Sequence, residues 1–246
     1  MSGMIGGFNY NTRSETIGDF CVILMDRVNV KTGESLFDAS IRSYSGKDTV
    51  VKIPAKFGKY ITTGIHAHAF YNNNFIKTIS IPDTIINIGT HAFNGCTKLE
   101  TIWVVSTFTN RNVNDLWLSD GVFSDCENLE KILLGEKEIL TYAASGGQFK
   151  NCPKLCCLQA SLKYVRAGTF ASCDNLETLT VADDGFFEPK SLNLLTSLKS
   201  ISFKGNIDIK NMSKRVLSQM AKLKISCPKD SNVMDLAYLG ADISIT

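Results

Sequence analysis

The chain has 246 residues, of which 44% are apolar and 20% are charged, and its formal net charge is +2. This is enough apolar material for an extended core, and the near-neutral balance without a dense Lys/Arg cluster predicts no nucleic-acid partner. Wholly apolar runs such as Val22 to Met25 are far too short to cross a bilayer, so we expect no membrane span.

Residues 1–45 precede any repeated pattern. Phe20 to Val30 and Leu36 to Tyr44 have the composition of two strands around the turn Lys31 to Glu34, which predicts a β-hairpin that caps one end of the fold. The first ten residues are expected to be flexible. They also lack a basic segment followed by an apolar one, so we expect no secretory signal.

From residue 46 to residue 226 one pattern recurs, in which a Phe is followed by a Cys three residues later and then by regularly spaced apolar residues. Five copies begin at Phe70, Phe93, Phe123, Phe149 and Phe170, the first with Asn73 in place of Cys. An apolar pair of the type Ile-x-Ile ends each copy, and the pairs begin at residues 51, 79, 102, 132, 158, 179, 201, 223 and 243. We count about seven repeats, each 20 to 30 residues long.

Each apolar pair predicts a short strand with one face inward and the other outward. One such unit cannot bury its apolar face alone, whereas stacked units form a parallel sheet with a continuous core behind it. The period is that of leucine-rich repeats. The prediction is therefore a leucine-rich-repeat solenoid of the α/β class, mostly short parallel β-strands with an irregular or 3-10 convex side, and with the Phe rings stacked in its core.

Residues 227–246 are predicted to form a partly helical C-terminal cap. Ser213 to Ala221 and Ser231 to Leu239 both have helical composition, with Ser231 as the N-cap of the second helix. Ile243 to Ile245 would add a last strand. No Pro/Gly/Ser-rich linker interrupts the chain, so we expect one structural domain.

The segments Ile81 to Ile85, Ile88-Gly89 and Ala92 to Cys96 resemble the BspA-like class of leucine-rich repeat, whose units read IP-x-x-V-x-x-I-G-x-x-A-F-x-x-C-x-x-L. The resemblance covers roughly residues 39 to 226. It implies adhesion or protein binding, and the surface members of this family carry a signal or an anchor. Since this chain shows neither and has free cysteines, we expect an intracellular location, with the cell surface as the alternative that the family implies.

Four cysteines, Cys96, Cys126, Cys152 and Cys173, occupy the same position in successive repeats. A column of this kind could suggest a metal or a set of disulfides. Because no Cys-x-x-Cys pair is present, and because buried thiols behave as small apolar groups, we predict that the column belongs to the core.

The three histidines are the weaker candidates for a metal site. His68 and His91 both precede a repeat Phe by two residues, so they should stack in adjacent coils with His66 nearby. The alternative is a solvated pair of imidazoles. We predict no metal, no cofactor and no catalytic residues, because the sequence has no Gly-x-Ser-x-Gly, Walker-type or His-Glu-x-x-His motif.

The outward strand positions are mostly small and polar, with Trp103 and Leu133 as exceptions. The longest repeat begins there, and its segment 105–117 adds further aromatic and basic residues of the kind that interfaces favour. The candidate partner-binding residues are Trp103, Leu133, Phe108, Arg111, Trp117, Lys131 and Cys157. The alternative is that the long loop folds back and buries Trp103.

The sequence therefore favours a non-enzymatic protein-protein interaction solenoid that binds protein partners through the strand face and the 105–117 loop. Two alternatives stay open. One is a fixed structural component of a larger assembly, either cytoskeletal, ciliary or virion-like. The other is a surface adhesin exported without a classical signal.

Overall fold

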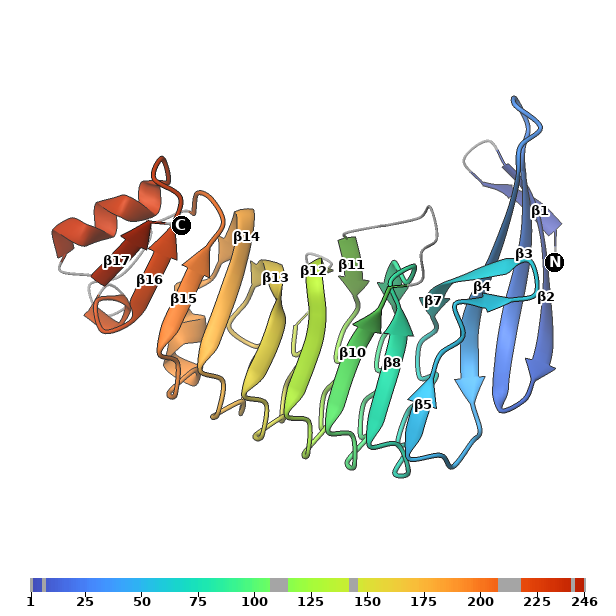
Figure 1. The fold of residues 1–246 in the computed structure, drawn as a ribbon, viewed down its shortest axis with the longest axis horizontal. Coiled ribbons are helices and arrows are strands. Elements are labelled where there is room, and N and C mark those ends of the chain that lie inside the picture. The colour runs from blue at the N-terminus through green and yellow to red at the C-terminus, as the bar shows by residue number, and fades with distance from the viewer. Residues whose placement is uncertain are drawn as a thin grey trace.

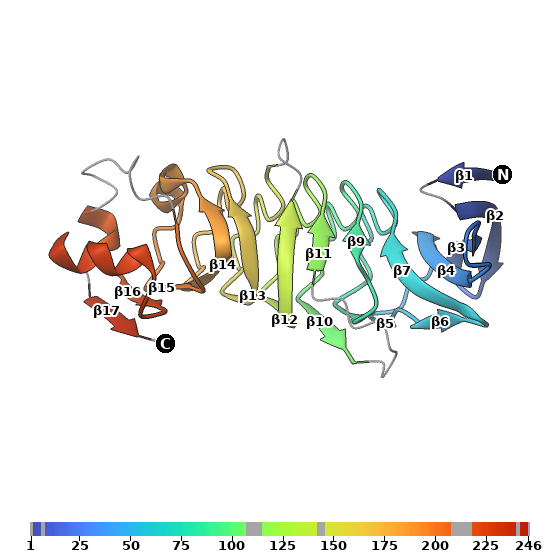
Figure 2. The same ribbon diagram turned by 90° about the horizontal axis from the view of Figure 1, so that it is seen from above.

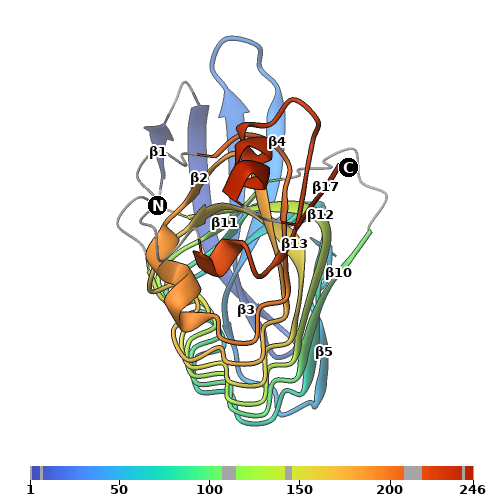
Figure 3. The same ribbon diagram turned by 90° about the vertical axis from the view of Figure 1, so that its left-hand side faces the viewer.

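The computed structural model describes residues 2–5, 8–106, 115–141, 146–207, 218–239 and 242–245. The chain winds into a solenoid whose coils stack side by side along the long axis (Figure 1). Seen along that axis, the coils overlie one another (Figure 3). All described strands join one continuous hydrogen-bonded network. The predicted solenoid of short parallel strands is confirmed.

Two parallel ladders form the walls of the solenoid. The first ladder contains β5 (Val50–Lys52), β8 (Thr78–Pro82), β10 (Thr101–Val105), the start of β12 (Lys131–Thr141), the start of β13 (Cys157–Val165), the start of β14 (Thr178–Phe187), β15 (Ser200–Phe203), β16 (Lys224–Cys227) and β17 (Asp242–Ile245). The second contains β7 (Tyr60–Ile65), β9 (Asn87–Ile88), β11 (Asp115–Leu118) and the ends of β12, β13 and β14. Seen from above, β10 lies at one long edge of the stack and β11 lies nearer its middle (Figure 2).

The N-terminal end is covered by antiparallel strands. β3 (Phe20–Asn29) pairs with β4 (Ser35–Tyr44), and β4 joins the second ladder through β7. A further strand that the sequence did not predict, β2 (Phe8–Ile17), pairs with β3, and β1 (Ser2–Ile5) pairs with β2. The first ten residues, which we expected to be flexible, thus contribute β1 and the start of β2. The short β6 (Lys56–Phe57) forms a hairpin with β7.

Toward the C-terminal end, the described part of the chain includes two 3-10 helices, η1 (Pro189–Leu194) and η2 (Asn232–Leu239). The η2 helix begins directly after Ser231, whose hydroxyl accepts a hydrogen bond from the backbone N–H of Val233 at 3.2 Å. The other predicted helix lies mostly outside the described residues.

The repeat phenylalanines form one buried column. Rings of Phe70, Phe93, Phe123, Phe149 and Phe170 stack in order, with centroids 4.8, 5.4, 5.7 and 5.1 Å apart and nearly parallel planes. All five side chains are fully buried. Because each ring contacts the next coil, the column holds the coils in register.

The cysteine column bonds each coil to the preceding one. The thiols of Cys96, Cys126, Cys152 and Cys173 donate to the carbonyl oxygens of Phe70, Phe93, Phe123 and Phe149 at 3.0, 3.1, 3.0 and 2.8 Å. These cysteines are buried and free. The column belongs to the core, as the sequence predicted, and each thiol also satisfies a backbone acceptor.

Candidate functional site

The outer face of the first ladder carries a cluster of apolar side chains with a lysine at its edge. We call this cluster the Trp103 surface and define it as Trp103, Val105, Lys131, Leu133 and Cys157. Trp103 on β10 pairs with Leu133 on β12, and Lys131 pairs with Cys157 on β13. Trp103, Leu133 and Cys157 are partly exposed, and 43% of Val105 is exposed. Strand alternation places these side chains outward because Ile102 and Ile132 between them are fully buried.

The strands on either side of this surface carry polar residues. Trp103 aligns with Ser80 on one side, and Leu133 aligns with Gln159 on the other. Further along the ladder, Thr180 aligns with Ser202 and then with Ser226. Lys224 aligns with Ser200, so a lysine also lies on this face near the C-terminal end of the ladder. The Trp103 surface is thus an apolar interruption in a polar face.

A hollow of about 400 Å³ adjoins the Trp103 surface. It is lined by Cys157, Gln159, Thr178, Thr180 and Lys204, among others. It lies where β13 and β14 separate, since their described pairing starts only at Leu162 and Val181. The first ladder therefore has an opening between two strands that offers hydroxyl and amide groups directly beside apolar side chains.

The segment inserted between β10 and β11 follows Val105 of the Trp103 surface in the sequence. Trp103 and Asp115 are twelve positions apart in the sequence, whereas their partners Leu133 and Glu138 are five positions apart on the uninterrupted β12. Phe108 and Arg111 lie outside the described residues. Among the described residues, Trp103 is partly exposed.

Trp117 does not join the Trp103 surface. It lies on β11 in the second ladder, where it pairs with Asn87 and Leu140, and 36% of it is exposed. Because the two ladders form different walls of the solenoid, the two tryptophans that are close in sequence face different sides.

Lys137 joins the two coils on either side of the coil that carries the insertion, and sequence reasoning did not identify it. Its side chain is buried, and its ammonium group donates to the backbone oxygens of Asp83 at 2.9 Å and Ile85 at 3.5 Å. Burial lowers the pKa of Lys137. Asp83 belongs to the coil before the insertion and Lys137 to the coil after it, so the lysine reaches across the inserted coil. No sequence pattern marks this position.

The histidines do not come together as a metal site. The rings of His68 and His91 lie 5.7 Å apart, as their repeat positions predicted. His66 instead bonds through Nε2 to the hydroxyl of Ser40 at 3.1 Å, and its pKa is lowered by burial and by Arg42. Within the described residues there is no group of three or more His, Cys, Asp or Glu side chains arranged to hold a metal ion.

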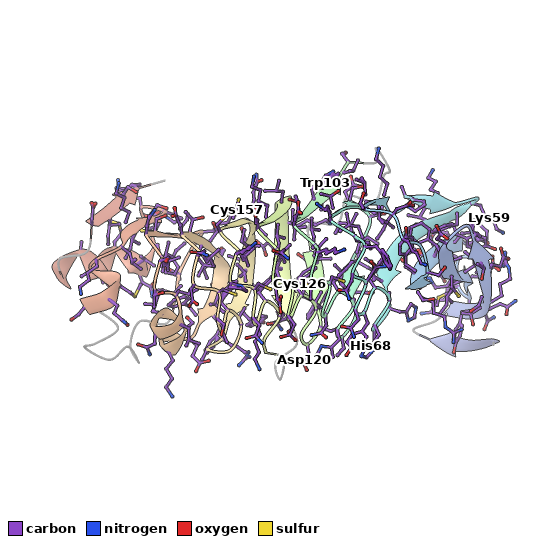
Figure 4. All side chains as sticks on the ribbon, turned by 90° about the horizontal axis from the view of Figure 1, so that it is seen from below. Lys59, His68, Trp103, Asp120, Cys126 and Cys157 are labelled. Atoms are coloured by element: carbon purple, nitrogen blue, oxygen red, sulfur yellow. The ribbon has the colours of Figure 1, made fainter. Side chains whose placement is uncertain are left out.

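Figure 4 shows that the labelled side chains lie on two different sides of the molecule. Trp103 and Cys157 lie along one long side, His68 and Asp120 lie along the other, and Cys126 lies between them (Figure 4). The backbone N–H of His91 donates to the carbonyl of Asp120 at 2.9 Å, so this second side is formed by the turns that precede each Phe. The candidate surface and the histidine pair are therefore separate features.

In the part of the chain that the structure describes, no helix is both long and apolar enough to cross a bilayer. A family model described as the BspA type leucine rich repeat region matches the chain in six copies, over residues 63–185 and 119–237. No curated protein matches the chain.

Several solved structures are similar to the chain. A leucine-rich repeat protein of T. pallidum, TpLRR, is 23% identical, with 85% of this chain and 95% of that one covered and a TM-score of 0.48. A leucine rich cell surface protein from Faecalibacterium prausnitzii is 15% identical, with 96% and 95% covered and a TM-score of 0.31. The pneumococcal vaccine antigen PcpA is 13% identical, with 100% and 98% covered and a TM-score of 0.30.

Proposed function

This chain belongs to the BspA-type leucine-rich repeat family, and from that premise we propose that it is a non-enzymatic solenoid that binds a protein partner through the Trp103 surface and the 105–117 segment. Repeats of this family are associated with protein-protein interaction and with surface proteins. Membership of the family supports a role in protein binding, and the residues of the first ladder indicate that the Trp103 surface is where the partner binds.

The observation that carries the proposal is the apolar interruption of a polar face. A solvated sheet face favours small hydroxyl-bearing side chains, which Thr78, Thr101 and Ser202 supply. Trp103 and Leu133 in register depart from that composition, and exposed aromatic side chains commonly supply most of the binding free energy at protein interfaces. Lys131 beside them adds a charge to the rim.

The hollow next to Cys157 adds polar recognition to this apolar anchor. A partner side chain that enters it would meet Gln159, Thr178 and Thr180. Interfaces with an apolar centre and hydrogen-bonding groups around it are typical of specific protein complexes. The 105–117 segment begins at Val105 of the Trp103 surface, and we propose that it contacts the same partner.

We propose an intracellular location for this interaction. All eight cysteines are free, and Cys156 and Cys157 are adjacent and at least partly exposed. Unpaired exposed thiols persist in reducing compartments. Fractionation of the native source with an antibody against the chain checks this, and a signal confined to the cell surface would support the adhesin alternative instead.

The test of the proposed surface uses the double substitution Trp103→Ala with Leu133→Ser. A partner is first captured from the native source with the wild-type protein, and its affinity is then measured with purified components. Loss of two central apolar side chains should weaken binding at least tenfold. The matched control, Ser202→Ala with Ser226→Ala, changes two aligned positions on the same ladder that lie outside the hollow and should leave the affinity within about twofold. Unchanged affinity of the Trp103/Leu133 variant for every captured partner contradicts the proposal.

A further inference from the structure

A second groove lies at the N-terminal edge of the first ladder, along β5, which is two strands away from Trp103. We call it the β5 groove. It has a volume of about 460 Å³ and lies between β5 and the turn from β2 to β3, where Gly18 adopts a φ of 58°. Ile17, Phe20 and Phe57 line it on the cap side, and Val50, Val51 and Lys52 line it on the ladder side.

The main chain of β5 has hydrogen-bonding groups that point into this groove. β5 pairs in parallel with β8 only, in the register Val51 opposite Ile79. The carbonyl of Thr49 accepts from Thr78, and the N–H of Ile53 donates to Ser80, both at 3.0 Å. Because hydrogen-bonding direction alternates along a parallel strand, the N–H and C=O groups of Val50 and Lys52 point away from β8. Among the described residues, these four groups have no hydrogen-bond partner.

Aromatic rings form the floor of the groove. Phe20 contacts Tyr44 at a centroid distance of 4.9 Å and Phe57 at 6.1 Å, and Tyr44 contacts Phe70 at 5.4 Å. The floor is therefore the end of the phenylalanine column that runs through the core. A side chain placed on it would be supported by a rigid, well-packed surface that requires little rearrangement on binding.

Opposite charges flank the groove at its two ends. Asp19 and Asp48 line the end where β5 begins, and Lys52 and Lys56 line the end where it finishes. Asp48 and Lys52 are four residues apart, or about 13 Å along an extended chain. None of these four side chains forms an ion pair with a described residue. The hydroxyl of Tyr44 donates to Asp48 at 3.4 Å, which fixes that carboxylate at the rim.

We propose that the β5 groove binds an extended peptide segment of a partner protein by adding it as a strand to the free edge of β5. A basic residue of that segment faces Asp19 and Asp48, an apolar residue sits on the aromatic floor, and an acidic residue four positions away from the basic one faces Lys52 and Lys56. Strand addition to a sheet edge is a general mode of peptide recognition. The unpaired main-chain groups require a peptide backbone, which a small charged molecule does not provide.

The test titrates isotopically labelled full-length protein with end-blocked pentapeptides. One probe has the sequence Arg-Val-Ser-Val-Glu, a second has the reverse order, and a control has Glu at both ends. We expect one of the two mixed-charge probes to shift the amide signals of Val50 and Lys52 more than that of Val51. It should bind at least tenfold more tightly than the control. Equal shifts throughout, or equal binding of all three probes, overturns the proposal.

Two variants separate the backbone from the charges. Val50→Pro removes one N–H that faces the groove while leaving the β8 side unaltered, and should weaken the preferred probe about tenfold. The pair Lys52→Glu and Lys56→Glu carries no risk to strand pairing and should weaken it by a similar factor, whereas the distant control Lys98→Glu should have no effect. If both groove variants bind as the wild type does, the proposal is wrong.

A second copy of this chain could also occupy the β5 groove, and the test must distinguish it from a foreign peptide. β17 is also an edge strand, and 59% of Ile245 is exposed. Sedimentation without peptide is expected to give a monomer at all concentrations. A concentration-dependent oligomer that Val50→Pro abolishes would assign the groove to another copy's C-terminal strand and overturn the assignment to a foreign peptide.

Discussion

At the residue scale, a fixed backbone conformation explains the two histidines that suggested a metal site. The residue two positions before the repeat Phe has a left-handed backbone in the first four of the five copies, with φ of 60° at His68, 54° at His91, 55° at Gly121 and 67° at Gly147. The imidazole of His91 lies where a side chain at position 121 would otherwise stand, 2.4 Å from the ideal Cβ. The histidine pair thus follows from repeat geometry, and glycine is the residue that meets this backbone at least cost.

This geometry predicts the order of stability of two substitutions at His91. An L-residue in the left-handed region costs about 1 kcal/mol, which glycine avoids and alanine does not. His91→Gly should therefore be more stable than His91→Ala by about 1 kcal/mol, the reverse of their usual order within strands and helices. Urea unfolding of the two variants measures the difference. An alanine variant as stable as the glycine variant would show that the position carries no backbone strain.

The cysteine column predicts a loss of stability at alkaline pH. Burial raises the pKa of Cys96 to about 12, against about 8.5 for an unfolded thiol. A raised pKa in the folded state means that the contribution is complete below pH 8.5 and is lost as the pH rises toward 12. The free energy of unfolding should fall over this window, and less steeply in Cys96→Ala, which lacks the ionising group. Parallel pH profiles of the two proteins would contradict this account.

At the scale of elements, the repeat period predicted the strands of the first ladder and the columns behind it, because buried positions leave a regular apolar pattern. The second ladder was not predicted. Its strands are as short as Asn87–Ile88, and β13 and β14 run through both walls without a sequence break. The sequence also did not predict that the two tryptophans lie on different walls, because Trp103 and Trp117 are close in sequence and were assigned to one surface. The burial of Lys137 could not be predicted, because a lysine in a sequence pattern indicates a surface position.

The inserted segment allows a test of one element on its own. Because β12 passes from the first ladder to the second without an insertion, shortening the β10–β11 connection by seven residues should leave the solenoid intact. The change in the free energy of unfolding should be small, since loop length contributes only slowly to stability. Partner affinity should fall at least tenfold if the segment contacts the partner. Full affinity of a folded deletion variant would remove the segment from the binding site.

At the scale of the whole molecule, the stack is uneven along its length. The phenylalanine column continues from Phe20 and Tyr44 to Phe170, and the thiol bonds end at Cys173. Beyond them, Leu192, Leu195 and Leu198 fill the corresponding core. The coils up to Cys173 therefore have both ring stacking and thiol bonds between them, whereas the coils beyond it are held mainly by aliphatic contacts and by the single ring contact of Phe187 with Phe203. In a linear array of coils, local stability follows these nearest-neighbour contacts.

Hydrogen exchange should reveal this difference. We expect the backbone amides of β15, β16 and β17 to exchange faster than those of β8, β10 and β12, because the C-terminal coils open without unfolding the rest. Mass spectrometry of exchanged peptides measures the exchange of the two groups of strands separately. Uniform protection along the first ladder would mean that the solenoid unfolds as one cooperative unit and that the two columns add no local stability.

The central claim is that the Trp103 surface, and not the opposite wall, contacts a protein partner. The most direct measurement places a photo-reactive amino acid at position 133 on the first ladder or at position 87 on the second, in the native cell. The account predicts that a partner crosslinks from position 133 in stoichiometric yield and that position 87 gives none. Crosslinks to that partner from position 87 with none from position 133 would contradict it.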